Sequence, residues 1–129
     1  MRIIIAGGRD FNNFNLLESE TIKILKQLKS EGCYNTKLDI TIVSGTASGA
    51  DRLGERFAYK YDLKIQRFPA NWELHGKNAG YKRNQQMSTF VKEDDGVLIA
   101  CWNGKSKGTK HMIDIATNDG LKVFVVNYE

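Results

Sequence analysis

Short apolar runs alternate with segments of helical periodicity along the whole chain, and this alternation limits the fold more than any other feature. The apolar runs lie at residues 2–6, 39–43, 63–68, 96–101 and 121–126. The run at residues 2–6 is unbroken and β-branched, as is typical of a strand buried on both faces of a parallel sheet, whereas residues 63–68 alternate between apolar and polar side chains. Apolar residues recur at helical spacing between the apolar runs, at residues 17–28, 53–61, 78–91 and 109–118.

Strands joined by helices through short connections form parallel sheets with right-handed crossovers. We therefore predict an α/β fold, a Rossmann-like three-layer sandwich with a mainly parallel sheet of about five strands and helices on both faces. Asn12, Asn13 and Asn15 offer cap residues for the first helix, and Glu18 follows Asn15 at capping-box spacing. These units use almost all of the 129 residues, so we expect a single domain over residues 1–129.

Charge and cysteine content indicate the broad class of the protein. The formal net charge of +4 fits an anionic partner, and it equally fits an ordinary lysine-rich soluble surface. Cys33 and Cys101 are far apart and lack CxxC or Cys/His spacing, which argues against a disulfide framework or a zinc site. We therefore expect no metal site, and we expect no resident cofactor. The apolar run at residues 3–6 is too short to cross a membrane, so we expect a cytoplasmic protein.

Four of the apolar runs end in turns that are rich in glycine or charge. These turns cover residues 7–10, 44–51, 71–83 and 103–109. In a parallel sheet the carboxyl ends of all strands lie along one edge, where the following helices present unpaired amides to anions. That edge is the predicted binding face. The candidate ligand-binding residues are Gly7, Gly8, Arg9, Asp10, Ser44, Gly45, Thr46, Ser48, Gly49, Asp51, Trp72, Lys82, Arg83, Asn84, Trp102, Gly104, Lys105, Gly108 and Thr109.

The turn at residues 44–51 gives the strongest local signal. Gly45 and Gly49 allow the backbone to turn tightly and to approach a ligand, and three hydroxyl side chains in the same turn supply hydrogen bonds. The spacing matches neither the P-loop nor the GxGxxG pattern. An ordinary tight turn is the alternative interpretation.

Charged residues in the other turns extend the hypothesis of an anion site. Arg9 can hold a phosphate or carboxylate through two hydrogen bonds, while Asp10 could orient Arg9 or accept ribose hydroxyls. A surface Arg–Asp pair is the alternative for these two. Lys82 and Arg83 add positive charge at a helix start, where a solvated basic turn is the alternative, and residues 104–109 are typical of a second phosphate cradle.

Several aromatic residues lie in or beside the same turns. Trp72, Trp102, Tyr81 and His75 could stack on a base or close over a ligand. Ordinary packing is the alternative for each of them. The sequence contains no Ser/His/Asp order typical of a nucleophilic triad and no set of metal ligands.

These turns resemble those of the SLOG superfamily, a Rossmann-like nucleotide-binding group that includes the Lonely-guy phosphoribohydrolases and the DNA-uptake protein DprA. They are most similar to its YspA-like branch. The resemblance rests on GGRDF at residues 7–11, SGTASGAD at 44–51, FPANW at 68–72, Arg83-Asn84 with Met87, and Gly108-Thr109. It implies a parallel sheet of five or slightly more strands, a homo-dimer or higher homo-oligomer, and a small phosphorylated, nucleotide-like ligand at the predicted edge.

The resemblance also bears on catalysis. In Lonely-guy enzymes an Arg four residues before a Met, and the Glu of a Gly-Thr-x-x-Glu motif, support cleavage of the base–ribose bond. Arg83 and Met87 keep the first spacing, but Met112 stands where the second motif has Glu. A methionine cannot activate water or stabilise an oxocarbenium-like centre, so we expect binding rather than turnover by that route.

Three functions stay open at this point, in the following order. The first is binding of a small nucleotide or nucleotide-derived signalling ligand, ADP-ribose-like or cyclic, by a sensor or sequestering protein. The second is a nucleotide phosphoribohydrolase or related N-glycosidase that uses Arg83 with Asp10 or Asp51. The third is DprA-like binding of single-stranded nucleic acid, for which the seven cations in or beside the edge turns are few. No membrane partner is expected.

Overall fold

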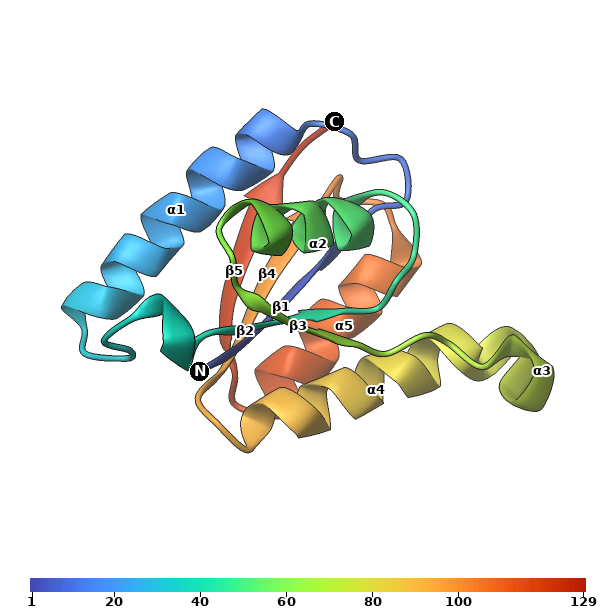
Figure 1. Ribbon diagram of the computed structural model, residues 1–129. Coiled ribbons are helices and arrows are strands. Elements are labelled where there is room, and N and C mark those ends of the chain that lie inside the picture. The colour runs from blue at the N-terminus through green and yellow to red at the C-terminus, as the bar shows by residue number, and fades with distance from the viewer.

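The computed structural model describes all of residues 1–129 as one five-stranded sheet covered by helices on both faces (Figure 1). Its strands are β1 (Arg2–Gly7), β2 (Thr41–Ser44), β3 (Lys64–Arg67), β4 (Gly96–Trp102) and β5 (Lys122–Asn127). Its longer helices are α1 (Phe14–Ser30), α2 (Ala50–Lys60), α4 (Ala79–Lys92) and α5 (Lys107–Asn118). Short helical turns occur at η1 (Lys37–Asp39), α3 (Trp72–His75) and η2 (Gly76–Asn78). The predicted α/β three-layer fold is confirmed.

Every pair of neighbouring strands is parallel, and the strand order is β3-β2-β1-β4-β5. The chain builds outward from β1 to β3 and then returns to the other side of β1 to form β4. The direction of winding therefore reverses between β1 and β4. In open α/β sheets such a reversal separates the turns that follow the two strands and leaves a crevice at their carboxyl ends.

Alternate residues of the central strand enter two separate cores, as the period of two in a strand requires. Ile3 and Ile5 pack with α1 and α2 on one face, in a cluster that includes Leu17 and Phe57. Ile4 packs with α4 and α5 on the other face. Because β1 is buried on both faces, its sequence is continuously apolar, and this continuity is the property that identified it as a parallel strand.

Several element boundaries differ from the predicted ones for local reasons. The cap of α1 is Asn13, whose side chain accepts a hydrogen bond from the Leu16 amide at 3.0 Å, so the predicted capping box of Asn15 and Glu18 is wrong. Glu18 instead pairs with Lys60 across the α1–α2 contact. The second strand begins two residues later than predicted, because residues 37–39 form η1 with a capping box of their own.

No helix of the structure combines the length and the apolar character that a membrane span needs.

Candidate functional site

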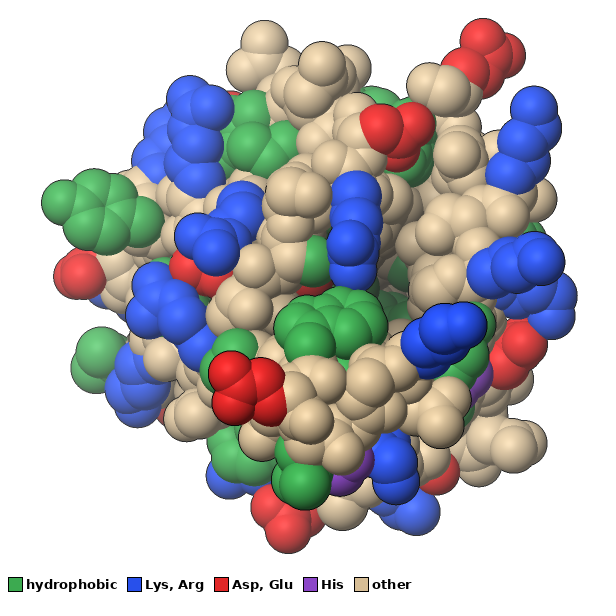
Figure 2. All heavy atoms as spheres, turned by 90° about the vertical axis from the view of Figure 1, so that its right-hand side faces the viewer, with side chains coloured by type: hydrophobic (Ala, Val, Ile, Leu, Met, Phe, Trp, Pro, Cys, Tyr) green, Lys and Arg blue, Asp and Glu red, His purple; other side chains and the backbone are tan.

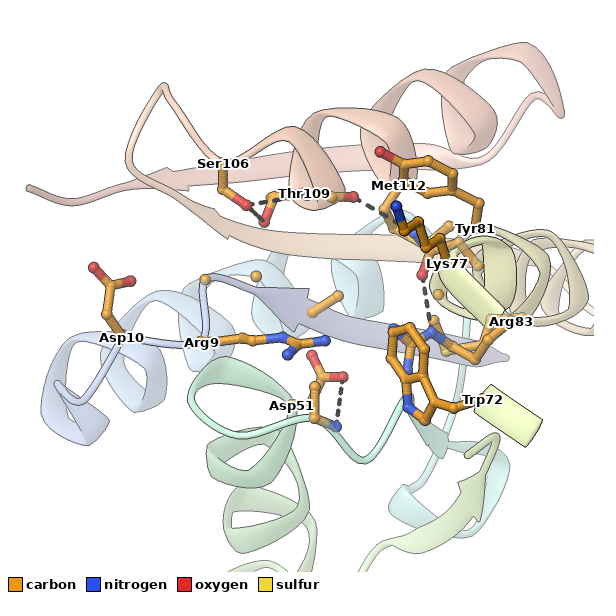
Figure 3. A pocket seen from close by; sticks show the side chains of 18 residues that line it. Arg9, Asp10, Asp51, Trp72, Lys77, Tyr81, Arg83, Ser106, Thr109 and Met112 are labelled. Atoms are coloured by element: carbon orange, nitrogen blue, oxygen red, sulfur yellow. Dashed lines mark hydrogen bonds between the residues drawn. The ribbon is translucent and has the colours of Figure 1, made fainter. Parts of the chain in front are cut away.

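A cleft of about 500 Å³ lies at the carboxyl ends of β1 and β4, where the winding of the sheet reverses (Figure 3). The turns after β1, β2 and β4 contribute to its wall, together with α3 and the first turns of α4 and α5. Its lining residues are Ala6, Gly7, Gly8, Arg9, Asp10, Ala47, Asp51, Trp72, Lys77, Gly80, Tyr81, Arg83, Asn84, Met87, Ser106, Gly108, Thr109 and Met112. Residues more than 100 positions apart in the sequence thus meet at the predicted edge.

The turn after β1 and the start of α2 fit together through their backbones. The Ala50 amide donates to the Gly8 carbonyl oxygen at 3.1 Å. Gly49 lies at φ 80°, and a Cβ atom at this position would overlap the Gly8 carbonyl oxygen and the Arg9 backbone. Glycine at residue 49 is therefore required both by its backbone conformation and by the close approach of the loop that carries Arg9.

Asp51 is a buried carboxyl group in the wall of the cleft. It is 5% exposed, and its Oδ2 accepts a hydrogen bond from the Ala47 amide at 3.2 Å. Burial raises the pKa of Asp51 to about 6, although the nearby positive charge of Arg83 acts in the opposite direction. A carboxyl group in such surroundings can exchange a proton near neutral pH.

Arg83 reaches across the cleft from α4 and is held by two acceptors. One terminal guanidinium nitrogen donates to the Gly45 carbonyl, and Nε donates to Asn84 Oδ1 at 3.0 Å. Asn84 Nδ2 in turn lies 3.2 Å from His111 Nδ1 on α5. Burial lowers the pKa of Arg83, and Arg9 contributes in the same direction, but a guanidinium remains charged in proteins. The chain of hydrogen bonds fixes the direction of this positive charge.

The turn before α5 satisfies many of its own backbone groups. Asn103 Oδ1 accepts from the amides of Lys105 and Ser106 at 2.8 and 2.9 Å, and Ser106 Oγ accepts from the Thr109 amide at 3.3 Å. These amides are therefore not free to cradle a phosphate in the way the sequence suggests. Gly108 lines the cleft in the first turn of α5, where amides lack partners within the helix.

Aromatic residues stand at the mouth of the cleft. Trp72 is 52% exposed, and the Arg9 guanidinium lies 5.9 Å from the centroid of its ring. Tyr81 lines the cleft and stacks on His111 with ring centroids 4.2 Å apart. Figure 2 shows the face that carries α3, with an apolar patch near its centre and Lys and Arg side chains on several sides of it.

A second hollow of about 230 Å³ adjoins the cleft. Arg9, Ala47, Trp72 and Arg83 line both spaces, so two guanidinium groups and an indole ring mark the junction between them. The second hollow is otherwise lined by Gly45, Thr46, Ser48, Pro69 and Ala70. The two hollows therefore adjoin at a positively charged neck, to which Arg9 and Arg83 contribute.

The structure brings most of the candidate residues together. Gly7, Gly8, Arg9, Asp10, Asp51, Trp72, Arg83, Asn84, Gly108 and Thr109 line the main cleft, and Gly45, Thr46 and Ser48 line the adjoining hollow. The other six candidates, Ser44, Gly49, Lys82, Trp102, Gly104 and Lys105, line neither space.

Two of these six have a supporting role that the hydrogen bonds define. Ser44 is buried, and its Oγ donates to Glu55 Oε2 at 2.6 Å and accepts from the Thr46 amide at 3.0 Å. Trp102 Nε1 donates to the Ser106 carbonyl oxygen at 3.1 Å and thereby braces the turn before α5.

The ligand-binding candidates lack eight of the lining residues: Ala6, Ala47, Lys77, Gly80, Tyr81, Met87, Ser106 and Met112. Of these, Tyr81 was named above only for stacking, and Met87 and Met112 only through the resemblance. Ser106 could have been found, because it stands three residues before Thr109 at the start of a predicted helix, the ordinary spacing of an N-cap. The apolar members carry no signal of their own, since they differ from core residues only in facing the cleft. No group of three or more His, Cys, Asp and Glu side chains is arranged to hold a metal ion.

Comparison with known proteins agrees with this architecture. The family model of the YspA, cpYpsA-related SLOG family matches residues 1–75, more than half of the chain. The chain belongs to this family. It is also similar to the Gene 61 protein of Mycobacterium phage D29, with 34% identity over 95 residues that cover 70% of this chain and 74% of that protein. No solved structure matches the chain.

The family match includes one part of the cleft wall and stops before the other. Arg9, Asp51 and Trp72 lie within residues 1–75. Arg83 and Thr109 lie beyond the matched residues. The resemblance to the YspA-like branch is confirmed, and membership of a SLOG family indicates a nucleotide-related function in general terms.

Proposed function

We propose that this protein binds a small phosphorylated, nucleotide-derived ligand in the cleft at the reversal between β1 and β4. One observation carries the proposal: the guanidinium groups of Arg9 and Arg83 line one cleft, and neither forms an ion pair with a carboxylate. The ion pairs of the molecule all involve other residues. Both guanidinium groups act on the buried Asp51 carboxyl and lower its pKa, but that single negative charge leaves an excess of positive charge for a ligand. Guanidinium geometry suits phosphate.

The shape of the depression supports an extended ligand over a compact one. Arg9 and Arg83 stand at the neck between the two spaces, where a diphosphate would meet both positive charges. Trp72 stands at the same neck and offers an aromatic face to a base. The hydroxyl groups of Thr46 and Ser48 in the smaller hollow suit a ribose. We therefore favour an ADP-ribose-like ligand over a cyclic mononucleotide, bound for sensing or sequestration.

Isothermal titration calorimetry with ADP-ribose, ADP and 3′,5′-cyclic AMP tests this proposal. We expect ADP-ribose to bind most tightly and Arg9→Gln to weaken its binding at least about tenfold, which is the loss expected for one charge-assisted contact. Lys23→Gln is the matched control, because Lys23 is 73% exposed on α1 and lines neither space. Absence of binding by all three nucleotides would refute the proposal.

Asp51 favours a second candidate function, a nucleotide N-glycosidase. Its carboxyl group lines the cleft and has a pKa of about 6, a value suited to proton transfer near neutral pH. Met112, which stands at the position of the Lonely-guy Glu in the sequence motif, also lines the cleft, so the carboxylate would have to come from Asp51 or Asp10. Chromatography of nucleotides incubated with the wild type and with Asp51→Asn tests this candidate. Release of a base by the wild type only would support it, and release by neither would exclude it.

A further inference from the structure

The carboxylate nearest to Arg9 in the sequence points away from it. Asp10 and Arg9 extend in different directions at the cleft (Figure 3). Asp10 Oδ1 accepts a hydrogen bond of 2.6 Å from the hydroxyl of Tyr128, a residue 118 positions later. The sequence-based prediction that Asp10 orients Arg9, like the alternative of a surface Arg–Asp pair, is therefore wrong for this conformation.

Tyr128 is held in place by three contacts besides the one to Asp10. Its amide donates to the Trp102 carbonyl oxygen at 3.1 Å, which continues the pairing of β5 with β4. Its ring meets Phe11 edge-on, with centroids 4.7 Å apart. Its hydroxyl lies so close to Gly8 that a Cβ atom there would overlap it. The tyrosine hydroxyl is thus fixed against the turn that carries Arg9.

The hydroxyl acts as a permanent donor to Asp10. Burial raises the pKa of Tyr128, and the hydrogen bond to Asp10 raises it further. The phenol therefore keeps its proton throughout the physiological range of pH. Without this donor, the Asp10 carboxylate would be free to approach Arg9, because an exposed carboxylate and guanidinium on adjacent loop residues attract each other.

We propose that Tyr128 is a positioning residue that holds the Asp10 carboxylate away from Arg9 and so keeps that guanidinium available for the phosphate of the ligand. This inference rests on the proposed function. Tyr128 itself does not line the cleft, and it acts only through Asp10. An Asp10 carboxylate paired with Arg9 would compete with a phosphate for the same donors and would remove the net positive charge at the neck.

A double-mutant cycle measured by calorimetry with ADP as the probe tests this role. We expect Tyr128→Phe to weaken ADP binding about tenfold, the order expected when a charge-assisted contact is lost. Asp10→Asn is the reference for the cycle, and Tyr128→Phe/Asp10→Asn should bind ADP within about twofold as tightly as Asp10→Asn does, because an amide cannot neutralise Arg9. Tyr34→Phe is the matched control, since the Tyr34 hydroxyl donates to the Leu25 carbonyl oxygen at 2.9 Å away from the cleft.

The outcomes separate this inference from the proposed function. If the wild type binds ADP and Tyr128→Phe binds it equally well, the positioning role is wrong while the binding function stands. If the double variant stays as weak as Tyr128→Phe, Tyr128 acts through packing of the turn, which also overturns the inference. If the wild type does not bind ADP, a crystal structure of Tyr128→Phe decides the inference, and the proposed function fails only if ADP-ribose and 3′,5′-cyclic AMP do not bind either. An Asp10 carboxylate within 4 Å of the Arg9 guanidinium supports the inference, and an unmoved carboxylate refutes it.

Discussion

Replacing Asp51 with Asn is expected to make the protein more stable at neutral pH. Burial raises the pKa of Asp51 from its ordinary value of 3.8 to about 6, so the folded state binds this proton more tightly than the unfolded state does. Relative to the protonated form, stability is therefore lost as the pH rises from 3.8 towards 6, and the loss is constant above that range. Each pKa unit corresponds to about 1.36 kcal/mol, so the full cost is about 3 kcal/mol.

The structure explains why the amide should avoid this cost. Asn Oδ1 can accept the hydrogen bond that the Ala47 amide now gives to Asp51, and an amide carries no charge to desolvate. Urea denaturation followed by circular dichroism should show a gain of about 3 kcal/mol for Asp51→Asn at pH 7.5 and of less than about 1 kcal/mol at pH 4.0. A variant that is no more stable than the wild type at pH 7.5 would refute the reasoning.

Asp114→Asn provides the matched control for this measurement. Asp114 is exposed on α5 and forms an ion pair with Lys110 at 2.8 Å. Exposed pairs of this kind contribute at most about 1 kcal/mol, and the change should be a small loss. If Asp51→Asn has a higher free energy of unfolding than the wild type and Asp114→Asn a slightly lower one, the wild type retains an ionisable group in its cleft at a cost in stability. Functional sites commonly do so.

Two further predictions concern backbone geometry and thiol chemistry. In urea denaturation, Gly49→Ala should lower the free energy of unfolding by more than about 3 kcal/mol, because the added Cβ overlaps the Gly8 carbonyl and the backbone is strained as well. Gly32→Ala is the control and should cost about 1 kcal/mol, because Gly32 has a similar φ of 79° but nothing within 4 Å of the added Cβ. Equal losses would contradict the role of the overlap. Burial raises the pKa of Cys101 to about 12, so a disulfide reagent at pH 8 should modify Cys101 only in denaturant. The folded Cys33→Ser variant, whose only cysteine is Cys101, should therefore show no reactive thiol. A fast reaction of this variant would contradict the burial of Cys101.

The fold could be predicted from the sequence because burial on both faces leaves a strong pattern. A strand such as β1 meets helices on each side, so every residue from Ile3 to Ala6 must be apolar, and the glycines that follow mark its end. The site could be predicted in outline for a related reason. Parallel strands place all of their following turns at one edge, so Arg9 and Arg83 approach each other although 73 residues separate them in the chain.

The details that could not be predicted depend on which of several equivalent groups makes a hydrogen bond. Asn13 and Asn15 are both suitable caps for α1, and only the path of the chain selects Asn13. Asn103 takes up the amides of the turn before α5, which sequence spacing assigned to a phosphate. The contact of Asp10 with Tyr128 spans 118 residues and leaves no periodic trace in the sequence. The choice among such hydrogen-bond partners depends on which segments the tertiary fold brings together.

Because the winding reverses between β1 and β4, two different parts of the chain form the two sides of the cleft. One bank comes from the part of the chain that forms the first three strands, and the opposite bank comes from the part that begins with α4. A ligand that contacts both Arg9 and Arg83 therefore links these two parts of the chain. Ligand binding and the association of the two parts are then coupled by mass action. If the chain is cleaved between Pro69 and Asn78, we expect the two fragments to stay associated longer with bound ligand than without it.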